Sequence, residues 1–342
     1  MAVDVVDQLL DLAEGKPVYV FHEIVHNKHV VDRFRHRGTI FVEELDEVPP
    51  GSLVVFSAHG VSPAVRAQAK ARSLVSVDAT CPLVTKVHSE AIRYSRQGYQ
   101  ILLIGHADHQ EVVGTRGEAP DCTQVVQCPQ DIATLKIINP NKLVYLTQTT
   151  LSTDDAQIII DALKKSFPNI KEPPGSDICY ATTNRQMAVR QIAPECDVVL
   201  VVGSKNSSNS VRLTEISVNG GTPAYLLDDA SEIRAEWLTG TPGDGHEAVV
   251  LVTAGASAPE DLVADVCRTL LAKFGGEIEQ RDIVPEDVEF GLPITLKSIM
   301  REKGIDPDGK KIRVGIKPIS AKQYGAEPTS LTIRGGVPAG QS

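Results

Sequence analysis

The chain has 342 residues, 42% of them hydrophobic and 23% charged, which is the composition of an ordinary globular protein. A net charge of −10 and an aromatic content of only 4% argue against a nucleic-acid partner, because such proteins need basic surfaces and stacking rings. No run approaches the ~18 consecutive apolar residues of a membrane-spanning helix, so no membrane partner is expected. The chain opens with an acidic helical pattern instead of an export signal, and we expect a cytoplasmic protein.

Helical and strand-like patterns alternate along the chain. A first helix is predicted over Val3–Ala13, and a later one over Asp154–Phe167 with Ser152 as its N-cap. Short apolar runs predict strands at Val18–Phe21, Leu53–Ser57, Leu74–Val77, Ile101–Ile104, Leu143–Thr147, Val198–Val202, Ala224–Leu227 and Val249–Thr253. This alternation is typical of βα units, so the predicted fold class is α/β with mostly parallel sheets.

The spacing of these patterns predicts three similar α/β units, residues 1–80, 81–178 and 179–281, that face a common centre. Beyond residue 281 the rhythm weakens, and residues 282–342 are interpreted as a C-terminal tail. This tail is basic, since residues 292–342 hold nine Lys and Arg against four Asp and Glu, a net charge of +5. It is either a flexible terminus or a docking segment for an acidic partner.

Small polar residues or histidines follow nearly every predicted strand. In chain order they are His22 and His26, His59, His106 and His109, Gln148–Thr150, Gly203–Ser210, and Ala254–Pro259. Ligands of parallel α/β sheets bind outside the carboxyl ends of the strands. Six such loops together predict one ligand site lined by their side chains.

Two cysteines occupy matching positions 98 residues apart. Cys81 in V-D-A-T-C-P-L-V-T-K and Cys179 in D-I-C-Y-A-T-T-N-R each end a strand-like stretch and precede a helical one. A helix N-terminus favours the thiolate, which is the form that binds a metal or attacks an electrophile. The six cysteines are widely spaced, which favours free thiols over disulfides. A buried cysteine acting as a small apolar residue is the structural alternative, but two matched thiols indicate a site.

The loop Gly203–Ser210, G-S-K-N-S-S-N-S, combines backbone amides at a predicted helix start with polar side chains, which suits a phosphate or diphosphate. It lacks the second Gly and the Gly-Lys-Ser/Thr order of the P-loop, and a capped polar turn is the alternative. His109 and Glu111 are predicted to form a proton-delivery pair. The structural alternative is that both lie in a solvated loop. Thiols, carboxylate and anion loops together favour a redox or Lewis-acid reaction on a small phosphorylated molecule.

The segment His22–His26 reads H-E-I-V-H and matches the H-E-x-x-H zinc motif, with Asp32 where a third ligand could fall. A zinc-dependent hydrolase is therefore an alternative function. However, the motif directly follows a strand, and His29 replaces the glycine of the metzincin form. Anion binding by His26 and Asn27 is the preferred interpretation.

Seven strings resemble one family, in the family's order. They are H-E-I-V-H-N, S-A-H-G-V-S, D-A-T-C-P-L-V-T-K-V-H, T-Q-T-T-L-S, D-I-C-Y-A-T-T-N-R-Q, V-G-S-K-N-S-S-N-S and T-A-G-A-S-A-P, all within residues 1–281. They resemble the IspH/LytB family, the 4-hydroxy-3-methylbut-2-enyl diphosphate reductases of the methylerythritol phosphate (MEP) isoprenoid pathway. The resemblance implies reductive dehydroxylation of that substrate to isopentenyl and dimethylallyl diphosphates. It also implies a trefoil of three α/β units around a central [4Fe–4S] cluster, with ferredoxin or flavodoxin as electron donor.

The resemblance further implies roles for individual residues. Cys81 and Cys179 are the implied metal ligands, and Glu111 is the implied proton donor, with Thr149 and His109 as its catalytic neighbours. The residues implied in substrate binding, chiefly at the diphosphate, are His26, His59, His109, Thr149, Thr150, Ser207, Ser208, Asn209 and Ser257.

The sequence departs from the family at one point. The family has three cluster cysteines, and the first lies in a Gly-Phe-Cys-Ala-Gly-Val segment upstream of the helix that opens this chain, which begins Met1-Ala2-Val3. We expect that the start was assigned at an internal Met, because the other motifs are intact. With one of three ligands missing, the cluster is expected to be unstable in the chain as written. The remaining alternative is an inactive, truncated homologue that binds the diphosphate.

Overall fold

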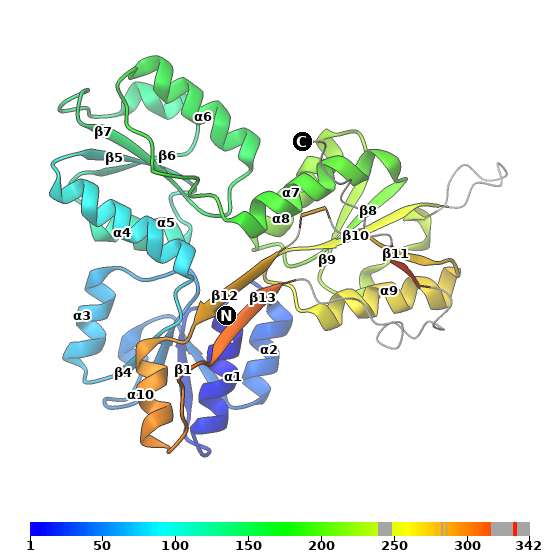
Figure 1. Ribbon diagram of the computed structural model, residues 1–342, viewed down its shortest axis with the longest axis horizontal. Coiled ribbons are helices and arrows are strands. Elements are labelled where there is room, and N and C mark those ends of the chain that lie inside the picture. The colour runs from blue at the N-terminus through cyan, green and yellow to red at the C-terminus, as the bar shows by residue number, and fades with distance from the viewer. Residues whose placement is uncertain (239–247, 282, 285, 316–330, 334–342) are drawn as a thin grey trace. The chain divides into compact units, whose positions relative to one another are not determined.

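The computed structural model describes residues 1–238, 248–281, 283–284, 286–315 and 331–333 (Figure 1). The chain divides into two compact lobes. Lobe 1 comprises Met1–Val25, Val30–Cys179 and Glu289–Arg313, and lobe 2 comprises His26–His29, Tyr180–Val288 and Val314–Ser342. Within the described ranges, no helix is long and apolar enough to cross a membrane.

The first part of lobe 1 is a four-stranded parallel sheet with helices. Its strands are β1 (Val18–Phe21), β2 (Thr39–Val42), β3 (Leu53–Phe56) and β4 (Val75–Asp78), in the order β2-β1-β3-β4. The accompanying helices are α1 (Ala2–Leu12), α2 (Lys28–His36) and α3 (Pro63–Ala71). All residues of β1 are buried, and the strand pairs with β2 and β3 on its two edges, so its unbroken apolar run is that of a central parallel strand. The loops after β3 and β4 carry His59 and Cys81.

The second part of lobe 1 is a three-stranded parallel sheet. Its strands are β5 (Gln100–Ile104), β6 (Thr123–Val126) and β7 (Leu143–Thr147), in the order β6-β5-β7. Its helices are α4 (Pro82–Arg96), α5 (Gln110–Glu118) and α6 (Thr153–Ser166). Leu102 and Ile104 pack with side chains of α6, whereas Ile101 and Leu103 pack with side chains of α4, because successive strand residues face opposite sides. Both faces of this sheet are therefore core.

Lobe 2 repeats this pattern around a sheet in the order β10-β8-β9. Its elements are α7 (Tyr180–Ile192), β8 (Val198–Val202), α8 (Ser208–Asn219), β9 (Ala224–Leu227), β10 (Val250–Ala254), α9 (Glu260–Phe274), β11 (Ile278–Gln280) and β14 (Leu331–Ile333). The central strand β8 is buried throughout, and it contributes alternate residues to two core clusters. β11 and β14 form a separate parallel pair.

The segment interpreted as a tail contains regular structure, which corrects that interpretation for residues 287–315. It forms β12 (Asp287–Gly291), α10 (Ile294–Glu302) and β13 (Lys311–Gly315), and β12 pairs with β13. Leu296 and Met300, one helical turn apart in α10, are buried, and α10 contacts α1 and β4. The short apolar stripe was obscured by flanking Gly and Pro residues. Residues 316–330 and 334–342 of the same segment lie outside the described ranges.

The predicted α/β class with parallel sheets is confirmed, since the strand registers of the three larger sheets are all parallel. Four predicted strands have the observed bounds, and the helix predicted at Asp154–Phe167 is α6 with Ser152 as its N-cap. The sequence prediction missed β2 and β6, which are short and begin with Thr. The division into units at residues 80, 178 and 281 stays a prediction.

Candidate active site

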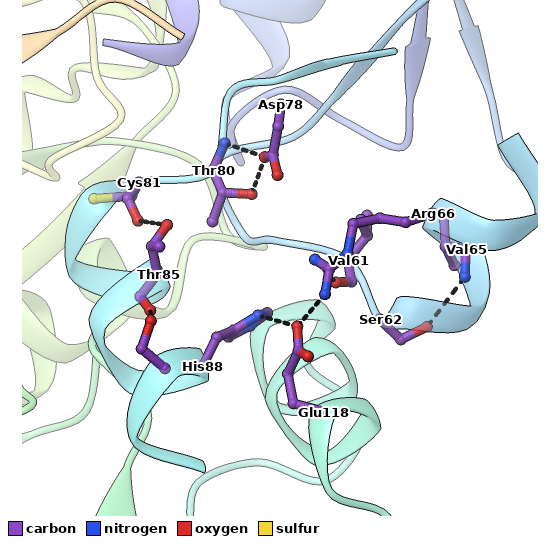
Figure 2. A network of polar contacts seen from close by, with 11 residues as sticks. Val61, Ser62, Val65, Arg66, Asp78, Thr80, Cys81, Thr85, His88 and Glu118 are labelled. Atoms are coloured by element: carbon purple, nitrogen blue, oxygen red, sulfur yellow. Dashed lines mark hydrogen bonds and ion pairs between the residues drawn. The ribbon is translucent and has the colours of Figure 1, made fainter. Parts of the chain in front are cut away.

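Cys81 lies at the junction of β4 and α4. It is the N-cap of α4, and Pro82 is the first helical residue, as the sequence predicted. Asp78 shapes the turn before it, because its Oδ1 accepts the backbone N–H of Thr80 at 3.0 Å (Figure 2). The N–H of Cys81 donates to the oxygen of Ala58 at 2.9 Å, which ties the turn to the loop after β3.

Cys179 occupies the corresponding position before α7. Its N–H donates to the oxygen of Thr149 at 2.9 Å, and Thr149 follows the end of β7. Neither cysteine forms a disulfide, and both are half-buried. The two thiols lie close enough that a charge on Cys179 raises the pKa of Cys81. The fold of lobe 1 thus brings together two thiols that are 98 residues apart in the sequence.

The protonation of Cys81 differs from the sequence expectation. Burial raises the pKa of this thiol above its ordinary value, and the nearby Cys179 and Glu111 act in the same direction. Hydrogen bonds from the N–H groups of Leu83 and Val84 favour the thiolate, as expected at a helix start, but they are outweighed. The prediction that the helix N-terminus lowers the pKa of Cys81 is therefore wrong for the metal-free protein.

Glu111 lies in the first turn of α5 and is only 2% exposed. Its Oε1 accepts the N–H of Thr149 at 2.6 Å, and its Oε2 accepts the Thr149 hydroxyl at 2.9 Å. Burial raises the pKa of Glu111 to about 7, although both bonds from Thr149 oppose this shift. The alternative of a solvated loop is therefore wrong for Glu111, which forms a buried carboxyl group able to release a proton near neutral pH.

Two histidine rings, those of His109 and His59, lie close together near the start of α5. His109 is the N-cap of α5, and its Nδ1 accepts the N–H of Glu111 at 3.2 Å, so this nitrogen carries no proton. The ring of His59 is perpendicular to that of His109, with 5.8 Å between the ring centroids. Thr150 belongs to the adjacent turn, where its hydroxyl accepts the side-chain amide of Gln148 at 3.0 Å.

A buried polar network that the sequence prediction missed holds these elements together (Figure 2). In this network Nδ1 of His88 on α4 contacts Oε1 of Glu118 on α5 at 3.0 Å, and Arg66 of α3 donates to the same oxygen. Burial would raise the pKa of Glu118, but the bonds from His88 and Arg66 outweigh it and lower the pKa. A Cβ atom on Gly60 would lie 3.0 Å from the His88 ring, so only glycine lets the loop of His59 approach α4 this closely.

In lobe 2, the predicted anion loop forms the N-terminus of α8. Ser207 is the helix N-cap and accepts the N–H of Ser210 at 3.4 Å, and Ser208 is the first helical residue. Asn209 is 3% exposed, and its side-chain oxygen and nitrogen have no hydrogen-bond partner within the described chain. Buried amides are normally paired, so this one fits a polar ligand at the helix start. The capped polar turn is therefore present, and anion binding by the same segment stays a prediction.

The segment of His26 joins this loop within lobe 2. Ser257, after β10, donates its hydroxyl to the backbone oxygen of His26 at 3.0 Å. The N–H of Lys28 donates to the hydroxyl of Ser204 at 3.3 Å. A Cβ atom on Gly255 would lie 2.0 Å from the Ser210 hydroxyl, so glycine is required where the loops after β8 and β10 meet.

The predicted site residues therefore fall into two groups. Lobe 1 brings together His59, Cys81, His109, Glu111, Thr149, Thr150 and Cys179, and lobe 2 holds His26, Ser207, Ser208, Asn209 and Ser257. Their roles stay predictions. Sequence reasoning assigned no role to Lys86 and His88, although both stand in the same motif string as Cys81.

The zinc-hydrolase alternative is not supported by the geometry of H-E-I-V-H. Residues 22–27 form bends after β1 rather than a helix, so His22 and His26 do not share a helical face. Nδ1 of His22 contacts Glu43 at 2.7 Å, and Asp32 accepts a hydrogen bond from Arg35 at 3.3 Å. No group of three metal-ligating side chains is assembled by the residues that the structure describes.

Comparison with known proteins identifies the family. The LytB protein family matches residues 1–271. The chain belongs to this family. Among curated relatives, 4-hydroxy-3-methylbut-2-enyl diphosphate reductase 2 of Mycobacterium bovis is 53% identical over 296 residues, 85% of this chain and 88% of that protein. The reductase of Azoarcus sp. is also 53% identical, over 86% of this chain and 93% of that protein.

Solved structures agree with this assignment. The E-1-hydroxy-2-methyl-but-2-enyl-4-diphosphate reductase of Plasmodium falciparum matches with a TM-score of 0.81 and 38% identity, over 89% of this chain and 94% of that one. A second structure, of (E)-4-hydroxy-3-methyl-but-2-enyl diphosphate reductase, matches with a TM-score of 0.58 and 30% identity, over 79% and 93% of the two chains. The family resemblance and the fold class predicted from the motifs are confirmed.

Proposed function

We propose that this chain is a 4-hydroxy-3-methylbut-2-enyl diphosphate reductase of the MEP pathway. The reaction uses two electrons and two protons to remove the allylic hydroxyl as water, giving isopentenyl or dimethylallyl diphosphate. Family membership over residues 1–271 supports this function. The observation that carries it is the buried Glu111–Thr149 pair, which lies beside two thiols at helix N-termini.

The cofactor that we propose is a [4Fe–4S] cluster with Cys81 and Cys179 among its ligands. The two thiols fit such a group, because they lie close together and burial raises the pKa of Cys81, so that ionisation of Cys81 is unfavourable without a compensating cation. The cluster would supply electrons and act as a Lewis acid toward the substrate hydroxyl. Family resemblance assigns three cysteines to the cluster, and this sequence contains two of them in motif positions.

In the proposed mechanism Glu111 protonates the departing hydroxyl. A carboxyl group with a pKa of about 7 retains a proton for part of the time at neutral pH, which an exposed glutamate does not. Thr149 fixes the orientation of this group by donating to both of its oxygens. His109, whose Nδ1 accepts from the backbone of Glu111, presents its other ring nitrogen as a donor.

Lobe 2 would bind the diphosphate. Asn209 offers a buried amide without an internal partner, and it lies at the positive end of α8. Ser207, Ser208, Ser257 and His26 supply further polar groups of the same lobe. His59 and Thr150 of lobe 1 are further residues that the family resemblance assigns to substrate binding. A ferredoxin or flavodoxin is the proposed electron donor.

The experiment that tests this function compares two proteins. One is the 342-residue chain, and the other carries a Gly-Phe-Cys-Ala-Gly-Val segment before Met1. Iron, acid-labile sulfide and the visible spectrum are measured after anaerobic reconstitution, followed by substrate turnover with a chemical reductant. We expect about four irons per chain, brown absorption and turnover in the extended protein.

Three results distinguish the alternatives. A full cluster in the 342-residue chain would show that another group replaces the third cysteine. Little iron in that chain, restored by the added segment, supports the reductase with three cysteine ligands. Absence of iron from both proteins, or a loaded cluster without turnover, contradicts the proposed function. Substrate binding to an iron-free chain would then favour a diphosphate-binding homologue.

A further inference from the structure

An ion pair between a half-buried lysine and a buried aspartate, outside the assigned site residues, joins the two cysteine segments of lobe 1. Lys86 lies in α4, five residues after Cys81, and its Nζ donates to Oδ1 of Asp177 at 2.9 Å. The same Nζ donates to the backbone oxygens of residues 175–176, at 3.5 and 3.0 Å. Because Asp177 precedes Cys179 by two residues, one ammonium group holds the segment leading into Cys179 against the helix that begins at Cys81.

Asp177 also accepts a hydrogen bond from the strand that leads to Thr149. Its Oδ2 accepts the N–H of Thr147, the last residue of β7, at 3.1 Å. Two residues further on, the oxygen of Thr149 accepts the N–H of Cys179 at 2.9 Å. One carboxyl oxygen of Asp177 thus contacts α4 and the other contacts β7, so the carboxylate lies at the junction of three segments.

Because this junction is buried, its geometry depends on the positive charge of Lys86. The side chain of Asp177 is 0% exposed, whereas that of Lys86 is 35% exposed. A second carboxyl group, Glu90 in the next turn of α4, has its Oε1 3.8 Å from Nζ, and burial together with the nearby Asp177 raises the pKa of Glu90. Without the ammonium group, a buried carboxylate would lose its counter-charge, which is far more unfavourable than burying the pair. The chain around residues 175–177 would then move toward water.

We propose that Lys86 and Asp177 are positioning residues that set the separation of the Cys81 and Cys179 thiols before any iron binds. Lys86 acts through the first turns of α4, and Asp177 acts through the two residues that connect it to Cys179. The relevance of this separation to a cluster rests on the proposed function. The separation itself is a property of the metal-free chain and can be measured there.

The test uses a chain in which Cys122, Cys128 and Cys196 are replaced by Ser and Cys267 by Ala. Cys81 and Cys179 are then cross-linked with bifunctional methanethiosulfonate reagents of graded spacer length, and the linked fraction is read by mass spectrometry. We expect the parent chain to prefer one spacer length. Lys86→Met and Asp177→Asn should each lower the yield at that length several-fold and flatten the preference. The double variant should match the worse single variant, because the two side chains act as one unit.

Lys165→Met, which removes an exposed lysine from α6, is the matched control and should leave the preferred length unchanged. Circular dichroism establishes which variants fold, and if Lys86→Met does not fold, Asp177→Asn decides the question. An unchanged spacer preference in the folded variants overturns the proposal. A parent chain without any preferred length overturns it as well.

A second measurement separates this proposal from the proposed function. In the extended protein that carries the third cysteine segment, Lys86→Met and Asp177→Asn should lose iron to a chelator about 10-fold faster than the parent. If the parent takes up no iron, the proposed function fails, whereas the cross-linking result still decides the role of Lys86 and Asp177. Iron loss at the parental rate counts against a role in holding the cluster.

Discussion

At the scale of single residues, burial decides the chemistry of the site in lobe 1. Glu111 and Cys81 are both acids whose pKa values burial raises, so their neutral forms persist at higher pH than in water. For Glu111 this favours proton donation, and Thr149 holds the group in a single orientation. For Cys81 it means that a bound cation, rather than the helix N-terminus alone, must stabilise the thiolate.

Glu111→Gln is expected to abolish most turnover while the cluster is retained. Glutamine has the same shape and can still accept the Thr149 N–H, but it cannot act as a general acid. We expect turnover of the extended, reconstituted protein to fall by about 10²–10⁴-fold. The visible spectrum of the cluster should be that of the parent. Turnover near the parental rate with an intact spectrum would remove Glu111 from its proposed role.

The same residue predicts how stability depends on pH in the metal-free chain. The pKa of Glu111 rises from 4.5 in the unfolded chain to about 7 in the folded one, so the folded state binds more protons between these values. Its contribution is complete below pH 4.5 and is lost as pH rises through 7. Relative to Glu111→Gln, the parent should therefore lose up to about 3 kcal/mol of unfolding free energy between pH 4.5 and 8. Urea titrations of both proteins measure this difference, and parallel curves would contradict it.

At the scale of elements, glycines allow the helices of lobe 1 to pack closely. A Cβ atom on Gly117, in the last turn of α5, would lie 2.4 Å from the Cβ atom of Ser62, the N-cap of α3. The network of His88, Glu118 and Arg66 lies beside this contact (Figure 2). The approach of α5 to α3 thus helps to place the N-terminus of α5, which carries His109 and Glu111.

Gly117→Ala is expected to destabilise the protein although alanine is the better helix former. Helix propensity favours alanine by about 1 kcal/mol, whereas the overlap with Ser62 forces a shift that typically costs about 1–3 kcal/mol. Chemical unfolding should therefore show a net loss. Ser62→Gly removes the opposing Cβ atom and keeps an acceptable N-cap, so the double variant should recover the lost stability. A Gly117→Ala protein as stable as the parent would show that α3 and α5 lie further apart.

At the scale of the whole molecule, the segment Glu289–Arg313 is an integral part of lobe 1. α10 places Leu296 and Met300 in the core, and it contacts α1 at one end of the chain and β4, which leads to Cys81. Lys303, just after α10, forms an ion pair with Glu14 at 2.5 Å. Residues near both ends of the described chain therefore support the sheet from which Cys81 emerges.

Truncation of Leu296 tests this packing. Leu296 is 0% exposed, and Leu296→Ala should lower the free energy of unfolding by about 2–5 kcal/mol, because it leaves a cavity between α10 and its neighbours. Ile294 lies in the same helix but is 84% exposed, so Ile294→Ala is the matched control with an expected effect within about 0.5 kcal/mol. Equal effects of the two substitutions, measured by chemical unfolding, would show that α10 is not packed in the core.

The local patterns of the sequence were sufficient for most elements, and the site residues predicted from its motifs stay predictions. Strands such as β7 and β8 are unbroken apolar runs, and α6 has a clear stripe with Ser152 as its cap, so their signals are contained in a few neighbouring residues. The motif strings around Cys81 and Cys179 were likewise recognised from neighbouring residues. The short strands β2 and β6 and the helix α10 were missed because their weak local patterns depend on burial by distant parts of the chain.

The sequence by itself determined the α/β class, the order of the elements and the family. Only the tertiary structure decided which polar residues meet and how burial changes their acidity. It placed Glu111 against Thr149, joined Lys86 to Asp177 across 91 positions, and raised the pKa of Cys81 where the helix start alone predicted the opposite. The physical reason is that secondary structure follows from short-range periodicity, whereas solvation and charge pairing depend on contacts between residues far apart in the chain.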